Sequence, residues 1–297
     1  MSNNRDHVEE VVEWVAVNDY EFYTHVYKST IQPPKATLTL VHGISEHVDR
    51  YADLARHFAR SGIQVIGFDQ RGFGKTGKRN NDLGDNGGID NVAKDIAAMN
   101  ALIGIDGVKH FLFGHSMGGL NVLNFCSFHG DGRVTGVVAQ SPALRPGKPL
   151  MPTPEVLEVF RSGKFDRSVI MKTNIKEEYL CDNQDELAKL ADDKDMIDFC
   201  AVGTMADINN AGTDVIKNAN AFNVPVLLAH GDGDMATDAK GSKAFFEGLP
   251  ASLDKNIKIY ENCPFHEIHF QEDISPELIA LYTQWILARA GSSAAVL

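Results

Sequence analysis

Cysteine is scarce in this sequence, and no two cysteines have the spacing of a reactive or metal-binding pair. The 297 residues include four, Cys126, Cys181, Cys200 and Cys263. None are separated by two residues, the spacing typical of structural zinc sites and dithiol redox motifs. The histidines also lack the close-spaced sets that zinc or iron requires. We therefore expect four buried thiols, no metal and no cofactor.

Positive charge and long apolar runs are also in short supply. Lys and Arg total 28 against 40 Asp and Glu, which gives a net charge of −12. This sign opposes binding to nucleic-acid phosphates or to anionic bilayers through bulk charge. Residues 1–13 are polar, without the apolar core of a secretion signal, and no apolar run is long enough to span a bilayer. We expect a cytoplasmic protein that binds no nucleic acid.

What the sequence does contain is an alternation of apolar runs and amphipathic stretches. Two runs rich in valine and aromatic residues, 11–17 and 20–27, predict an opening β-hairpin. Short apolar runs then recur at residues 36–41, 63–68, 108–113, 134–139, 224–229 and 257–260. Runs of this kind are typical of central parallel strands, and the stretches between them have helical periodicity. The predicted fold class is α/β, a mostly parallel sheet with helices on both faces.

Residues 147–214 interrupt this alternation. They contain prolines, polar helical stretches and no strand-like run, and residues 148–214 hold 8 basic and 14 acidic residues. Long insertions between strands often serve as lids over a site. We interpret residues 1–146 and 215–297 as the two parts of a core and residues 147–214 as a helical cap. The alternative is a solvated acidic decoration.

A Gly-x-Ser-x-Gly motif, from Gly114 to Gly118, follows the apolar run at 108–113 and precedes a helical stretch. In this context the motif forms a sharp turn that lifts the serine hydroxyl, here Ser116, above the edge of the sheet. Side chains at the two glycines would collide with neighbouring backbone. The positive end of the following helix favours developing negative charge. Five residues alone are a weak signal, but their context predicts a nucleophilic serine.

A serine nucleophile needs a base and, to orient it, a carboxylate. The run at 224–229 leads into a segment that holds Asp232 and Asp234, and the run at 257–260 leads to His266. Ser116, Asp234 and His266 follow a known triad order, each on a loop at the same sheet edge. Taken singly, Asp234 is more often a helix cap and His266 a surface or packing residue.

The remaining requirement is a pair of amides that bind the oxyanion of the tetrahedral intermediate. The run at 36–41 ends at His42-Gly43-Ile44, where Gly43 lets the backbone turn. The amide of Ile44 can then face the oxyanion, and the amide of Met117 is the second donor. A strand that ends at a glycine explains the turn but not its coincidence with the triad. Together these features predict a serine hydrolase.

Three longer motifs carry a resemblance to a known family. They are His42-Gly43-Ile44-Ser45-Glu46-His47 with Arg50-Tyr51, Asp69-Gln70-Arg71-Gly72-Phe73-Gly74, and Gly114-His115-Ser116-Met117-Gly118-Gly119. With them the chain resembles the monoacylglycerol lipases and the wider serine-aminopeptidase-like branch of the α/β-hydrolases. The resemblance covers nearly the whole chain outside the insertion, and it implies an α/β-hydrolase fold with a cap.

The resemblance also implies the role of each reacting group. It makes Ser116 the nucleophile, His266 the base and Asp234 the orienting acid. It places the oxyanion donors at the amides of Ile44 and Met117. Only this resemblance, and no physical argument, selects Asp234 over Asp232 and Asp238, and His266 over His269.

Substrate recognition is implied less completely. Arg50 and His115 match a polar patch that recognises the glycerol hydroxyls in that family. In the cap, where the match is poor, Glu178 and Tyr179 are the candidates. Ile44 is larger than the residue usual at its position, which narrows the acyl channel although only its amide is required.

The predicted function is hydrolysis of monoacylglycerols to glycerol and free fatty acid through an acyl-enzyme on Ser116. A lysophospholipase, a general carboxylesterase and an aminopeptidase share this chemistry and stay open, although the acidic insertion disfavours phosphate-bearing substrates. A catalytically silent binding protein is the alternative outside enzymes.

An apolar cluster in the insertion bears on where such an enzyme would act. It consists of Val156, Leu157, Val159 and Phe160. Exposed on the surface, it would give the cap peripheral contact with membranes or lipid droplets. The same spacing fits a buried helix face equally well.

Overall fold

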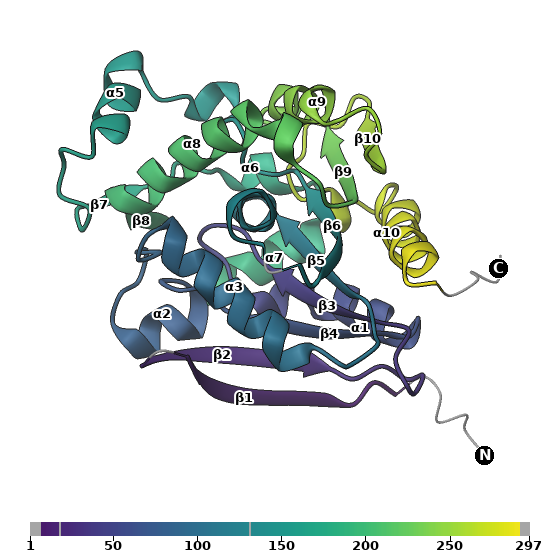
Figure 1. Cartoon of the computed structure of the whole chain (residues 1–297). Helices are drawn as coiled ribbons and strands as arrows, with labels where there is room; N and C mark the ends of the chain where they lie inside the picture. The colour runs from purple at the N-terminus through teal and green to yellow at the C-terminus, as the bar shows by residue number, and fades with distance from the viewer. Residues whose placement is uncertain (1–6, 18, 131, 292–297) are drawn as a thin grey trace.

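The computed structural model describes residues 7–17, 19–130 and 132–291, and the turn residue Asn18 lies outside this range. One eight-stranded sheet has the order β1-β2-β4-β3-β5-β6-β9-β10 (Figure 1). Its strands are β1 (Glu10–Val17), β2 (Tyr20–Tyr27), β3 (Ala36–Val41), β4 (Ile63–Phe68), β5 (His110–His115), β6 (Val134–Gln140), β9 (Val226–Gly231) and β10 (Lys255–Tyr260). β2 pairs antiparallel with β1 and β4, and every later pair is parallel. The predicted hairpin and the mostly parallel sheet are confirmed.

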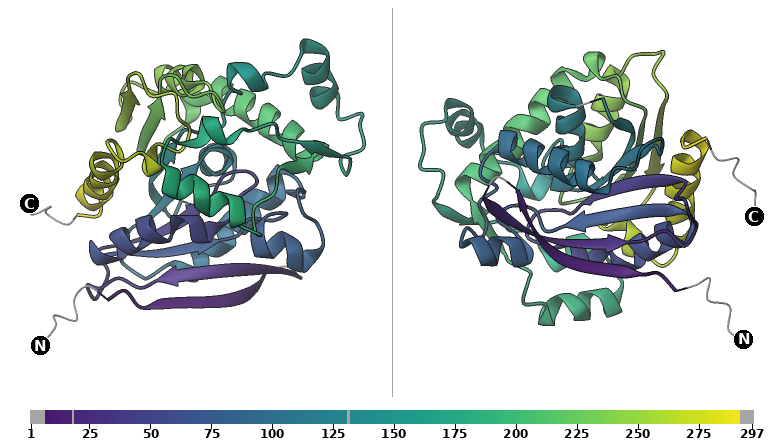
Figure 2. Two further views of the ribbon diagram at one scale, coloured as in Figure 1. Left: turned by 180° about the vertical axis from the view of Figure 1, so that it is seen from behind. Right: turned by 60° about the horizontal axis from the view of Figure 1, so that its bottom comes forward.

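Helices cover both faces of the sheet (Figure 2). Those of the core are α1 (Ala52–Arg60), α2 (Gly74–Asn80), α3 (Ile89–Ile103), α4 (Met117–Asn124), α9 (Ala239–Gly248) and α10 (Ser275–Arg289). Short helical turns are η1 (Val48–Tyr51), η2 (Phe125–His129), η3 (Lys148–Leu150), η4 (Ala219–Ala221) and η5 (Ile268–Phe270). On one face, α1 and α10 pack their apolar stripes against alternate residues of β3 and β5. On the other, α3 and α4 pack against Val41 and Leu112, and α9 packs against β9 and β10, so both faces of the sheet are covered.

The start and end of the covering helices follow from local sequence. In α1 the buried Leu54, Ala55 and Phe58 form one stripe, and the chain leaves the helix through Gly62 at φ 97°, a conformation that favours glycine. α10 begins with Ser275-Pro276, and proline at the first turn needs no amide partner. These helices therefore begin and end where the apolar periodicity predicts.

The insertion between β6 and β9 lies outside this sheet. It contains α5 (Pro154–Ser162), β7 (Ile170–Lys172), α6 (Glu177–Leu180), α7 (Gln184–Asp192), β8 (Phe199–Ala201) and α8 (Val202–Lys217). The β7–β8 pair was not expected, because strands of three residues are too short to stand out as apolar runs. α5 packs on α8, and α8 packs on α4 and α9. In Figure 1, α5 and β7 stand away from the sheet, at the left of the view.

The apolar cluster of α5 divides between surface and interior. Phe160 is buried, Leu157 is half-buried, and Val156 and Val159 are exposed. The cluster is therefore neither fully exposed nor a fully buried helix face, the two alternatives that the sequence left open. The helix thus covers the interior with one side chain and leaves valines at the surface.

Candidate active site

Ser116 lies in the turn between β5 and α4, at the carboxyl end of the strand. Its backbone has φ 56° and ψ −120°, a combination that L-residues rarely adopt and that marks functional turns. A Cβ added at Gly114 would lie 2.3 Å from the carbonyl oxygen of Gly118. One added at Gly118 would lie 2.1 Å from the carbonyl oxygen of Val41. The turn therefore requires glycine at both positions, as the motif predicts.

His266 and Asp234 lie in contact at the same edge of the sheet. His266, in the loop after β10, has its Nδ1 2.7 Å from Oδ2 of Asp234. Asp234 Oδ1 accepts the amides of Ala236 and Thr237 at 2.8 and 3.0 Å. The hydroxyl of Thr237 lies 3.0 Å from Oδ2, and Nε2 of His230 lies 3.2 Å from it. A carboxylate fixed in this way holds the imidazole by Nδ1 and leaves Nε2 to take a proton.

The charges of this pair support each other. Burial raises the pKa of Asp234, but the positive charge on His266 and the hydrogen bonds from the histidines outweigh it, so the pKa lies well below its usual range. Burial lowers the pKa of His266, but the charge and the hydrogen bond of Asp234 outweigh it, and the pKa is raised above 6.5. The site therefore stabilises an imidazolium ion, the species that forms when His266 takes the serine proton.

The other carboxylates and the other histidine are engaged elsewhere. Asp232 accepts the amide of Cys263 at 3.1 Å. Asp238 caps α9 by accepting the amide of Lys240 at 2.9 Å. His269 is buried, with Nδ1 2.7 Å from the side-chain amide of Gln140. Geometry therefore favours Asp234 and His266 where the sequence alone could not choose.

Ser116 and His266 line one cavity. Among the described residues, no hydrogen bond joins the hydroxyl of Ser116 to the His266 ring. Such a bond often tightens only in the complex with substrate. Ser116 and His266 therefore lie at the wall of the same cavity without a hydrogen bond between them.

Two amides are available beside Ser116. Ile44, Ser116 and Met117 line the same cavity. Met117 is the first residue of α4, where amides have no acceptor within the helix. The amide of Ile44 finds no acceptor within the described ranges of the chain. Both amides can therefore donate to an oxyanion.

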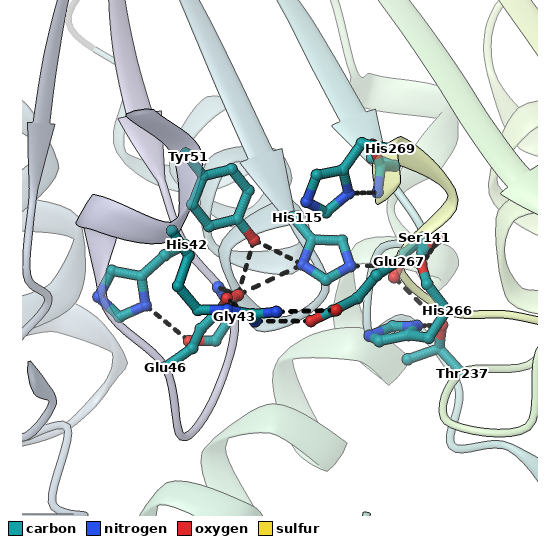
Figure 3. A network of polar contacts seen from close by, with 12 residues as sticks. His42, Gly43, Glu46, Tyr51, His115, Ser141, Thr237, His266, Glu267 and His269 are labelled. Carbon is teal, nitrogen blue, oxygen red and sulfur yellow. Dashed lines mark hydrogen bonds and ion pairs between the residues drawn. The ribbon is translucent and has the colours of Figure 1, made fainter. Parts of the chain in front are cut away.

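Arg50 lies in a buried cluster of charges behind this turn. Its Nη1 donates to Glu46 at 2.5 Å and to Glu267 at 2.6 Å, and its Nη2 donates to Glu267 at 2.8 Å. In Figure 3, the two carboxylates of this cluster, Glu46 and Glu267, approach each other from the left and the right, below His115. Nδ1 of His115 lies 2.7 Å from the hydroxyl of Tyr51. Both predicted polar residues, Arg50 and His115, line the cavity that holds His266.

The two cap candidates lie apart from the cavities. Glu178 is exposed and pairs with Lys176 at 3.3 Å. Tyr179 is buried, and its carbonyl oxygen accepts the amide of His266 at 2.8 Å. Neither side chain lines either of the cavities at Ser116. The backbone of α6 therefore contacts the histidine loop, while the side chains of these two residues do not face Ser116.

Two cavities of different character meet at Ser116. The first, of about 460 Å³, is mainly apolar and lies under the insertion; it is lined among others by Met151, Val156, Phe160, Met171, Met205 and Ile208. The second, of about 500 Å³, has a mixed lining: apolar side chains such as Leu180, Leu190 and Phe199 stand beside the charged groups Glu46, Arg50, Glu177, Asp193, Asp198 and Glu267. A molecule with one apolar and one polar end can place the bond between them at the serine.

Sequence reasoning did not assign three of the residues that shape this site. Thr237 contacts Asp234, and Glu46 and Glu267 enclose Arg50. Glu46 precedes Arg50 by four positions, and Glu267 directly follows His266. These two spacings are the sequence features from which the charge cluster could have been predicted. No set of three or more metal-ligating side chains occurs within the described part of the chain. Nor does any helix described there combine the length and the apolar character needed to cross a bilayer.

A mostly parallel sheet with a serine elbow after β5 and the Asp234–His266 pair after β9 and β10 defines an α/β-hydrolase fold. The comparison of sequences is more specific. Residues 32–273 match the family described as "Serine aminopeptidase, S33". The chain belongs to that family.

Individual relatives are similar over most of this chain. An uncharacterized abhydrolase domain-containing protein of Dictyostelium discoideum is 29% identical over 86% of the chain, which spans only 27% of that relative's length. A putative monoglyceride lipase of Schizosaccharomyces pombe is 28% identical, over 85% of this chain and 67% of its own. The crystal structure of Paleococcus ferrophilus monoacylglycerol lipase superposes with a TM-score of 0.79 at 27% identity, over 90% of this chain and 99% of that one.

Proposed function

We propose that the protein is a serine carboxylic-ester hydrolase that cleaves monoacylglycerols to glycerol and free fatty acid. The observation that carries this proposal is the placement of Ser116, on a strained elbow, at the junction of an apolar and a polar cavity beside the Asp234–His266 pair. The names of the relatives from Schizosaccharomyces pombe and Paleococcus ferrophilus support it.

In the proposed mechanism His266 takes the proton of Ser116 as the serine oxygen attacks the ester carbonyl. The amides of Ile44 and Met117 bind the resulting oxyanion. The tetrahedral intermediate collapses, His266 gives its proton to the departing glycerol oxygen, and the acyl chain stays on Ser116. A water molecule, deprotonated by His266, then attacks the acyl carbon. The bond to Ser116 breaks, His266 returns the proton to the serine oxygen, and the fatty acid leaves.

The two cavities divide the substrate between them. An acyl chain fits the apolar cavity, and a small polyol fits the polar one, where we place Arg50 and His115 among the groups around the hydroxyls. The carboxylates of Glu177, Asp193 and Asp198 also line this second cavity. They repel a phosphate group, which disfavours lysophospholipids relative to monoglycerides.

We assign residues 147–214 to a cap that roofs the acyl cavity and contacts lipid surfaces. Apolar side chains of this segment are exposed although the chain is acidic. They are Met151, Val156, Val159, Val169 and Ile170. With a net charge of −12, attraction to anionic lipid cannot supply the contact, so we assign it to this exposed cap patch.

The experiment that tests the function compares turnover of a monoglyceride, a lysophospholipid of the same acyl chain and an aminoacyl amide. We expect the monoglyceride to have the highest kcat/KM and Ser116→Ala to have no activity above background. A preference for the lysophospholipid or the amide would refute the substrate. The absence of activity on every ester would favour a binding protein.

A further inference from the structure

The buried cluster of Glu46, Arg50 and Glu267 has no part in the serine chemistry as described so far. Their side chains are 3%, 7% and 3% exposed. Two carboxylates face one guanidinium, so the cluster carries one excess negative charge. Burying three charges gives little stability compared with well-packed apolar side chains. The cluster therefore calls for a role other than stability.

Each member of the cluster is attached to a different part of the site. Glu46 Oε1 accepts the amide of Gly43 at 2.5 Å, one residue before Ile44. Glu267 directly follows His266 in the chain, and Arg50 binds both of its oxygens. Arg50 and Glu267 are 217 positions apart, so their ion pair joins the first loop of the site to the last.

The carboxylate of Glu46 is also connected to the serine turn, through Tyr51 and His115. The hydroxyl of Tyr51 lies 2.7 Å from Oε1 of Glu46 and 2.7 Å from Nδ1 of His115. His115 immediately precedes Ser116, and its ring is tilted by 47° to that of His266, with 4.7 Å between the ring centroids. The oxyanion turn, the serine elbow and the histidine loop thus meet at Glu46 (Figure 3).

We infer that Glu46, Arg50 and Glu267 are positioning residues, a brace that fixes the oxyanion turn and the His266 loop relative to each other. Ester hydrolysis requires the Ile44 amide and the His266 ring to reach one tetrahedral centre, and misplacement by about 1 Å can cost about a hundredfold in rate. This inference rests on the proposed function. It assigns to Arg50 a main role different from contact with the alcohol, because both N–H groups of Nη1 and one of Nη2 bind the two carboxylates.

The brace also contributes charge at His266. The ionisable and ring groups that face His266 are Asp234, Glu267, Glu46, Arg50, His115 and His269. After Asp234, the negative charges of Glu267 and Glu46 raise the pKa of His266. Removing the charge of Glu267 should therefore move the acid limb of the kcat/KM profile to lower pH.

The test compares Glu267→Gln with a matched variant elsewhere. Asp95 is a buried carboxylate, 4% exposed, that binds Arg71 through both oxygens at 2.9 and 3.0 Å. Asp95→Asn therefore breaks a similar ion pair outside the brace. We expect Glu267→Gln to lower kcat by about tenfold or more, on a monoglyceride and on p-nitrophenyl acetate alike, with little change in KM. We expect Asp95→Asn to lower the melting temperature at least as much and to leave kcat unchanged.

Three results would overturn the inference. They are an unchanged kcat in Glu267→Gln, a loss confined to KM for the monoglyceride, and an equal loss of kcat in Asp95→Asn. A confined KM loss would mean that the cluster contacts the alcohol.

A second measurement addresses the brace as a unit. Arg50→Met, Glu267→Gln and the double variant form a cycle in which a shared function gives a combined loss smaller than the product of the single losses. Losses that simply multiply would contradict a brace. The readout is the rate at which a fluorophosphonate labels Ser116, which requires no assumption about the natural ester. If the unmodified protein does not label, the proposed function itself fails; if it labels and Glu267→Gln labels equally fast, only the brace fails.

Discussion

Asp234 is held by more donors than a surface carboxylate would be. Two backbone amides bind one oxygen, and Thr237, His230 and His266 surround the other. Because these groups favour the charged form, Asp234 stays ionised despite its burial. Its charge in turn raises the pKa of His266. At the scale of single residues, Asp234 thus orients His266 and favours its protonated form, as a general base requires.

Replacing this carboxylate tests its role directly. Asp234→Asn should lower kcat by about 10⁴-fold, because the amide holds the imidazole in the wrong tautomer. KM should change much less. Asp232→Asn is the matched control, since Asp232 lies two positions away and its side chain accepts the amide of Cys263 rather than contacting His266. Steady-state kinetics on a short soluble ester measure both variants, and a larger loss in the Asp232 variant would show that the wrong carboxylate was chosen.

The raised pKa of His266 sets the pH dependence. The ring must be neutral to take the proton of Ser116, so activity falls as the pH drops below its pKa. Because that pKa lies above 6.5, the acid limb of kcat/KM should have its midpoint above pH 6.5. A profile measured on a soluble ester checks this. A midpoint below 6.5, or a flat profile across it, would contradict the Asp234–His266 pairing.

The strands that build the site could be predicted well, and the connections between distant residues could not. The bounds of β3 and β4 are those of the apolar runs at 36–41 and 63–68, because both strands are buried on both faces. β10 begins two residues before its apolar run, because its first two residues, Lys255 and Asn256, are polar. β7 and β8 have three residues each and are too short to leave a pattern.

The residues of the site likewise fall into those that local sequence predicts and those that depend on long-range contacts. The serine elbow follows from five consecutive residues and the strand before them. The ion pair between Arg50 and Glu267 depends on how two loops 217 residues apart fold together. No local rule predicts such a pair. The bounds of the cap at 147 and 214 stay a prediction, and α8 runs through the second of them to Lys217.

The elbow makes a prediction at the scale of a single turn. Gly118→Ala places a methyl group 2.1 Å from the carbonyl oxygen of Val41, which is backbone and cannot rotate away. We expect a loss of about 1–3 kcal/mol or more in the free energy of unfolding, together with lost activity. Gly130→Ala is the control, because its Cβ would meet nothing closer than 3.6 Å and φ is −53°. Urea denaturation of both variants decides the point: equal stabilities would mean that the turn is not constrained as described.

In the whole molecule, the insertion that carries the exposed cap patch also lines part of the apolar cavity at Ser116. Val156 belongs to both, since it is exposed and also lines the apolar cavity. An acyl chain that left a lipid surface at the patch would therefore enter the cavity without crossing the acidic remainder of the surface. If the cap contacts lipid as proposed, this arrangement gives an acidic protein an apolar route from a lipid surface to Ser116.

The patch can be tested without touching the cavity. Val159 and Ile170 are 45% and 54% exposed and line neither cavity at Ser116. We expect the double variant Val159→Ser, Ile170→Ser to bind neutral lipid vesicles severalfold more weakly and to hydrolyse emulsified monoglyceride more slowly. Its activity on a short soluble ester and its melting temperature should stay unchanged. Leu102→Ser removes an equally exposed apolar side chain, 52% exposed, from α3 in the core and should change none of these properties. Equal binding by all three proteins would place lipid contact elsewhere.

The most direct test of the central claim is to identify the residue that reacts. The protein is treated with a fluorophosphonate, and the modified peptide is located by mass spectrometry, with Ser116→Ala and His266→Ala treated in parallel. A serine activated by His266 predicts one adduct per chain, on Ser116, absent from the first variant and formed far more slowly in the second. An adduct on another residue, or labelling that persists in Ser116→Ala, would contradict the account.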